Sequence, residues 1–99
     1  MPESPDSKSF AENLHSVFRM LLPEGTSLNL ELIEVAEQND SPHSEQFSVT
    51  FRGPLTPVCP QHIYKLEHER LGTMELFLVP LGPEKEGMLY QSCFNRLRK

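Results

Sequence analysis

The chain has 99 residues, 37% of them hydrophobic and none of them tryptophan, which suffices for one small domain with one modest core. No apolar run approaches the roughly 20 residues that a membrane-spanning helix needs, so we expect no membrane partner. Three of the nine basic residues lie in the last four positions, and residues 1 to 95 therefore carry six basic against 14 acidic residues, a net charge of −8 that argues against a nucleic-acid partner.

The N-terminal region predicts a flexible lead followed by a short helix. Residues 1 to 7 contain two prolines and two serines, which is typical of a disordered segment, and they lack the apolar stretch of a secretory signal. We therefore expect a cytoplasmic location. Ser9 followed by Glu12 fits a capping box, and Phe10 and Leu14 have helical spacing. A single turn that runs directly into a strand fits the same residues.

Residues 16 to 23 and 26 to 38 alternate between apolar and polar side chains and predict two strands separated by a turn. In the second strand Leu28, Leu30 and Leu32 share one face, whereas the next apolar residues, from Ile33 on, share the other. A change of phase by one residue inside a strand predicts a β-bulge.

Two further segments alternate clearly. Residues 46 to 53 place Phe47, Val49 and Phe51 on an inner face. Residues 62 to 69 place Tyr64, Leu66 and His68 on one face, and Gly72 then allows the tight turn of a hairpin. Both segments are predicted strands with one buried face.

Residues 73 to 81 are apolar on both faces of a predicted strand. Met74, Leu76 and Leu78 form one face, and Phe77, Val79 and Leu81 form the other. Such a strand is expected to be covered on both sides, and the N-terminal helix is the expected cover. A turn at residues 82 to 87 and a last strand at residues 88 to 95 complete the pattern.

About six strands joined by short turns favour sequential antiparallel pairing. We expect a mainly β fold, a single small antiparallel roll or partly open barrel that a short N-terminal helix plugs or caps. The predicted domain covers residues 8 to 95, and residues 96 to 99 form a basic tail that we expect to be a solvated terminus.

Four stretches together resemble a family of small bacterial proteins catalogued as a domain of unknown function. They are Phe51 to Pro54, Tyr64 to Gly72, Met74 to Gly82, and Phe94 with Asn95, and Phe10 with residues 17 to 20 near the start belongs to the same pattern. The resemblance covers nearly the whole chain and implies no assigned activity. It implies an association with phage-tail-like assemblies.

Cys59 and His62 have the spacing of half a zinc site, but no second half follows, because Cys93 has no neighbouring Cys or His. Cys59 lies between prolines in a loop and outside the family pattern, and no third group completes a Cys/His nucleophile. We therefore predict no catalytic residue, no metal site and no cofactor. Both cysteines are expected to be free thiols.

Charged side chains offer weaker signals. His68 is expected to fill space while one ring nitrogen bonds a neighbouring group, with a pH-sensitive contact beside Glu67 and Glu69 as the alternative. Glu75 adds a carboxylate to the same hairpin. We expect these acidic residues to lie on a solvated face, paired with charged side chains of the neighbouring strand. Arg52 is expected to bind a carboxylate, either of this chain or of a partner.

The leading hypothesis is a non-catalytic structural or protein-interaction module, with a protein partner or self-association through a surface of Phe77, Val79, Leu81 and Arg52. The alternative is a small barrel that binds an apolar ligand in a pocket lined by aromatic residues. The predicted lining consists of Phe47, Phe51, Tyr64 and Phe94. A third hypothesis is a metal or thiol enzyme at Cys59 and His62.

Overall fold

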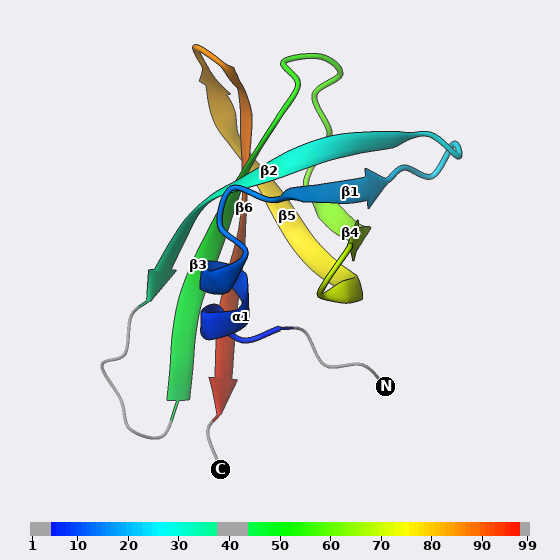
Figure 1. Cartoon of the computed structure of the whole chain (residues 1–99). Helices are drawn as coiled ribbons and strands as arrows, with labels where there is room; N and C mark the ends of the chain where they lie inside the picture. Colours follow the sequence, from blue (N-terminus) through cyan, green and yellow to red (C-terminus); the bar gives the residue numbers. More distant parts are fainter. Residues whose placement is uncertain (1–4, 38–43, 98–99) are drawn as a thin grey trace.

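A computed structural model of the chain describes residues 5–37 and 44–97. One short helix and six strands form the fold (Figure 1). In chain order they are α1 (Ser7–Glu12), β1 (Val17–Leu21), β2 (Ser27–Glu37), β3 (Ser44–Gly53), β4 (His62–His68), β5 (Gly72–Glu84) and β6 (Gly87–Leu97). The predicted number of strands and the short N-terminal helix are confirmed. Among these residues no helix is long and apolar enough to cross a membrane.

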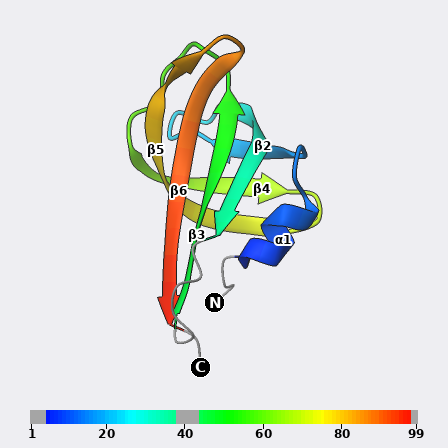
Figure 2. The ribbon, with the colours of Figure 1, turned by 90° about the vertical axis from the view of Figure 1, so that its left-hand side faces the viewer.

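The strands form a closed antiparallel barrel in the order β1-β2-β3-β6-β5-β4. Two three-stranded meanders, β1 to β3 and β4 to β6, are joined by the β3–β6 and β1–β4 pairs. Figure 2 shows β3 and β6 running side by side along the length of the barrel. The expected roll or partly open barrel is therefore fully closed. Closure gives every strand two neighbours, although residues 72 to 78 of β5 pair only with β4 and residues 92 to 97 of β6 pair only with β3.

The interior is filled by the side chains that the alternation predicts. Phe47, Val49 and Phe51 are buried, as are Tyr64, Leu66 and His68 on β4. The predicted bulge is confirmed, because the pairing of β2 with β3 shifts between Leu32 and Glu34. Thr50, on the outward phase, is also buried.

Helix α1 begins two residues before its predicted cap. The side chain of Asp6 accepts a hydrogen bond of 2.8 Å from the backbone N–H of Ser9, so Asp6 caps the helix and the capping box at Ser9 is wrong. A carboxylate is as good a cap as a hydroxyl, and it satisfies an N–H that the helix itself leaves unpaired. The helix therefore starts inside the predicted lead, of which residues 1 to 4 lie outside the described residues.

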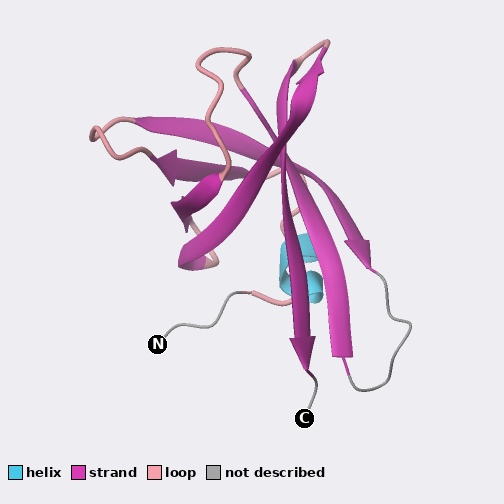
Figure 3. Cartoon of the chain, turned by 180° about the vertical axis from the view of Figure 1, so that it is seen from behind, coloured by secondary structure: helices cyan, strands magenta, loops and turns pink. Residues whose placement is uncertain are grey.

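The predicted cover of β5 is wrong. Helix α1 packs against β2 and β3, and its Phe10 is fully buried against the rings of Phe18, Phe47 and Phe94. Figure 3 shows α1 at one end of the barrel and the loop between β3 and β4 at the other. Because the helix closes an end of the barrel, the outer face of β5 is left open, with Phe77 50% exposed.

Two boundaries at the C-terminal end also differ from expectation. Strand β5 continues to Glu84, so the turn is shorter than the predicted 82 to 87, and a second bulge between Pro80 and Gly82 adjusts its pairing with β6. Strand β6 runs to Leu97, two residues past the predicted end of the domain. Its partner β3 begins at Ser44, two residues before the predicted strand of residues 46 to 53.

Candidate functional site

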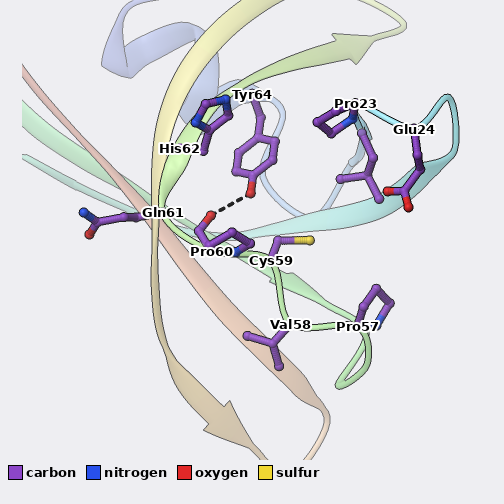
Figure 4. A pocket seen from close by; sticks show the side chains of 10 residues that line it. Pro23, Glu24, Pro57, Val58, Cys59, Pro60, Gln61, His62 and Tyr64 are labelled. Carbon is purple, nitrogen blue, oxygen red and sulfur yellow. Dashed lines mark hydrogen bonds between the residues drawn. The ribbon is translucent and has the colours of Figure 1, made fainter.

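A pocket of about 400 Å³ opens where the loop between β3 and β4 faces the β1–β2 turn. Figure 4 shows the sulfur of Cys59 and the carboxylate of Glu24 directed into the space between the two segments. The lining residues are Leu22, Pro23, Glu24, Pro57, Val58, Cys59, Pro60, Gln61, His62 and Tyr64. This volume lies within the range of small-ligand sites, about 300–1,000 Å³.

Two tyrosines of the barrel hold the loop in place. The hydroxyl of Tyr64 donates a hydrogen bond of 2.6 Å to the carbonyl oxygen of Pro60, and the backbone N–H of Cys59 donates one of 3.0 Å to the hydroxyl of Tyr90. Burial raises the pKa of both phenols, so both hydroxyls stay protonated at neutral pH. The loop wall of the pocket is therefore fixed to the core.

Cys59 and His62 make no hydrogen bond to each other among the described side chains. Cys59 is buried in the pocket wall, whereas His62 is exposed and rests with its ring edge-on to Tyr64, at 5.4 Å between centroids. Within residues 5–37 and 44–97 no three His, Cys, Asp or Glu side chains gather to hold a metal ion. Both cysteines are free thiols, and Cys93 is exposed.

The four residues expected to line one pocket lie in three places. Phe47 and Phe94 stack at 4.5 Å beneath α1, and Phe51 packs edge-on to Phe18 inside the barrel, at 5.1 Å. Tyr64 alone lines the pocket beside the β3–β4 loop. The interior of the barrel is thus a packed core.

The outer face of β4 and β5 carries a stripe of apolar side chains. Ile63 and Phe77 lie directly opposite each other across the two strands and are 58% and 50% exposed. Leu81 is equally exposed further along β5, and Val79 between them is half-buried. We call Ile63, Phe77, Val79 and Leu81 the β4–β5 stripe. In the part of the chain that the structure describes, no element covers it.

Arg52 binds three carboxylates of its own chain. Its guanidinium lies 2.9 Å from Glu31, 3.3 Å from Glu84 and 2.8 Å from Glu86. The hydrogen bond from Arg52 lowers the pKa of Glu31, and the bond to Glu31 raises the pKa of Arg52. The expected carboxylate contact of Arg52 is therefore made within the molecule, where it links β2 and β3 to the β5–β6 hairpin.

Ser16, which is half-buried, and His68, which is buried, form a pair that resembles a catalytic dyad. The hydroxyl oxygen of Ser16 lies 2.8 Å from Nε2 of His68. However, Nδ1 of His68 accepts hydrogen bonds from the backbone N–H groups of Arg70 and Leu71, at 3.0 and 3.1 Å. An imidazole that accepts at Nδ1 carries its proton on Nε2.

This tautomer decides the role of the pair. Nε2–H of His68 donates to Ser16, so it cannot take the serine proton as a general base would. Ser16 in turn donates to the backbone carbonyl of Asn13. The pair therefore locks the β4–β5 turn to the segment between α1 and β1. Its members are 52 positions apart, and no local signal marks Ser16 in the sequence.

These features define a small closed six-stranded antiparallel barrel with a filled interior, a helix over one end, a loop-walled pocket and an apolar outer stripe. The chain belongs to the family described as a domain of unknown function (DUF6916), whose model matches residues 5–94. The resemblance inferred from the sequence is confirmed at that level. Comparison with curated proteins found no match, and comparison with solved structures found none.

Proposed function

We propose that this protein is a non-catalytic interaction module that docks on a partner protein through the β4–β5 stripe. The observation that carries the proposal is the cross-strand pair Ile63 and Phe77, two large apolar side chains that are each at least half exposed. Aromatic residues on an exposed apolar patch are typical of protein interfaces.

The closed barrel determines how such a partner would bind. The stripe lies on the outer face of the barrel, so we expect a partner to contact the side chains that project from that face. Phe77 supplies the largest apolar surface of the stripe and is the expected anchor.

Charge favours a different protein over a second copy of this chain. The whole chain carries a net charge of −5, so two copies repel each other. The expected partner presents an apolar ridge bordered by basic residues. The family resemblance suggests a phage-tail-like assembly as the setting.

Site-specific photocross-linking in the producing cell tests this proposal. A photoreactive residue at Ile63 or at Phe77 should give an adduct with the same partner protein. Val17 is the matched control, because it is 55% exposed on β1, outside the stripe, and should give no such adduct. An adduct with twice the mass of this chain, or equal adducts at all three positions, would overturn the proposed docking.

Small-ligand binding is a second candidate function, and one observation favours it. The pocket beside the β3–β4 loop has the volume of a ligand site and a wall that tyrosine hydrogen bonds hold in place. The pocket lies at the end of the barrel away from α1, not in the interior that the sequence suggested.

A further inference from the structure

We infer that the pocket between the β1–β2 turn and the β3–β4 loop binds a ligand that has an apolar body and one cationic end, such as an alkylamine. This inference deepens the second candidate function, ligand binding, and rests on it. It is independent of the β4–β5 stripe.

The residues that line the walls of the pocket favour a ligand with an apolar body. Prolines 23, 57 and 60 line it together with Leu22, Val58 and the ring of Tyr64. Proline rings and an aromatic face offer apolar contact without flexible side chains, so little conformational entropy is lost when a ligand packs on them. The exposed Val58 extends the apolar surface to the mouth of the pocket.

The carboxylate of Glu24 favours a ligand with a cationic end. Among the ten lining residues, all within the described part of the chain, Glu24 is the only Asp, Glu, Lys or Arg. Figure 4 shows its carboxylate turned toward the pocket. Among the described side chains Glu24 forms no ion pair, unlike Glu31, Glu84 and Glu86, which share Arg52. The net charge of −8 on residues 1 to 95 adds a long-range attraction for cations.

The pocket is formed before any ligand arrives. The hydrogen bonds from Tyr64 to Pro60 and from Cys59 to Tyr90 hold the loop against the core. A preformed site avoids the ordering cost of a mobile loop, so even a small ligand can bind measurably.

A titration followed by two-dimensional NMR tests the inference with two probes of the same shape. Cyclohexylmethylamine carries a cation at neutral pH, and cyclohexylmethanol is its neutral counterpart. We expect the amine to shift the signals of residues 22 to 24 and 57 to 64. Its affinity should exceed that of the alcohol by about three- to fivefold, the effect of one exposed ion pair.

Two variants distinguish the effect of the Glu24 carboxylate on affinity from the effect of the overall charge. Glu24→Gln should remove most of the difference in affinity between the amine and the alcohol, whereas Glu34→Gln, which removes the same charge from the exposed Glu34 on β2, should preserve the difference. Equal affinities of the two probes for the unmodified protein, or equal losses in both variants, would overturn the cationic preference but leave ligand binding intact. If neither probe shifts the pocket signals, both the inference and the second candidate function fail.

Discussion

At the scale of single residues, hydrogen bonds fix the chemistry of His68. Its Nδ1 accepts hydrogen bonds from two backbone N–H groups of the β4–β5 turn, and its Nε2–H donates to Ser16. Its ring packs against Phe18 in a tilted arrangement, with 4.3 Å between ring centroids. If Nδ1 were protonated, it could no longer accept hydrogen bonds from the two backbone N–H groups. Its own N–H would then face those two N–H groups and be repelled by them. Burial also lowers the pKa of His68 below its usual 6.5.

This environment predicts a pH dependence of stability. Because the unfolded chain binds a proton at His68 more readily than the folded chain does, the free energy of unfolding should fall as the pH drops below 6.5 toward the lower folded pKa. The slope for one proton is at most about 1.4 kcal/mol per pH unit. Denaturant unfolding at several values between pH 7.5 and pH 5 measures it.

The matched variant is His68→Asn, whose side-chain oxygen can still accept the turn N–H groups but does not titrate. Its free energy of unfolding should change less over the same interval. An identical decline in both proteins would assign the effect to another group. Glu31, with its pKa lowered by Arg52, contributes separately, and only below its usual value of 4.5.

At the scale of elements, helix α1 acts as a plug for one end of the barrel. Its six residues are too few to be stable alone, so packing must hold it. Phe10 supplies that packing through three aromatic contacts, with ring centroids 5.7 to 6.1 Å apart.

Truncation of this anchor should be costly. Phe10→Ala should lower the free energy of unfolding by about 3–5 kcal/mol, because it leaves a cavity among the rings that Phe10 contacts. Leu14→Ala is the control, since Leu14 lies just after the helix and is 40% exposed, and it should cost less than about 1 kcal/mol. If denaturant unfolding showed the same loss of free energy in both variants, the stability of α1 would not depend on the buried ring of Phe10.

Local patterns predicted most of the strands. The alternation of Phe47, Val49 and Phe51 and the phase change after Leu32 depend on neighbours in the chain, and both are present in the structure. The turn at Gly72 sets the hairpin register, so it could also have placed Ile63 opposite Phe77. The sequence also led us to expect the helix as a plug or cap of the barrel, but the contacts that hold α1 there were not predictable, because they join aromatic residues that are distant in the chain.

At the scale of the whole molecule, closure of the barrel creates the candidate sites. The β1–β4 pair, with Arg19 opposite Glu67, brings the β1–β2 turn near the β3–β4 loop. Glu24 meets Cys59 at the pocket only because of that long-range pairing. The prolines identify the β3–β4 loop in the sequence, but no local pattern indicates that this loop faces the β1–β2 turn. Most of the residues that line the pocket were therefore not predicted.

The exposed stripe is also a property of the whole barrel. The sequence predicted an apolar outer face on β5 and a helix to cover it, yet α1 is held at the barrel end by Phe10. Phe77 and Leu81 thus stay open, each at least half exposed, in an otherwise acidic molecule. An apolar face without a cover in its own chain is the physical basis for the proposed docking.

The most direct test of this docking is a calorimetric titration of the purified protein with the partner that cross-linking identifies. Phe77→Ser should weaken binding by at least tenfold, as expected for an interface anchor, while Val17→Ser should change it by less than twofold. Both variants should unfold at the same denaturant concentration as the unmodified protein. Equal affinities for Phe77→Ser and the unmodified protein would contradict docking through the β4–β5 stripe.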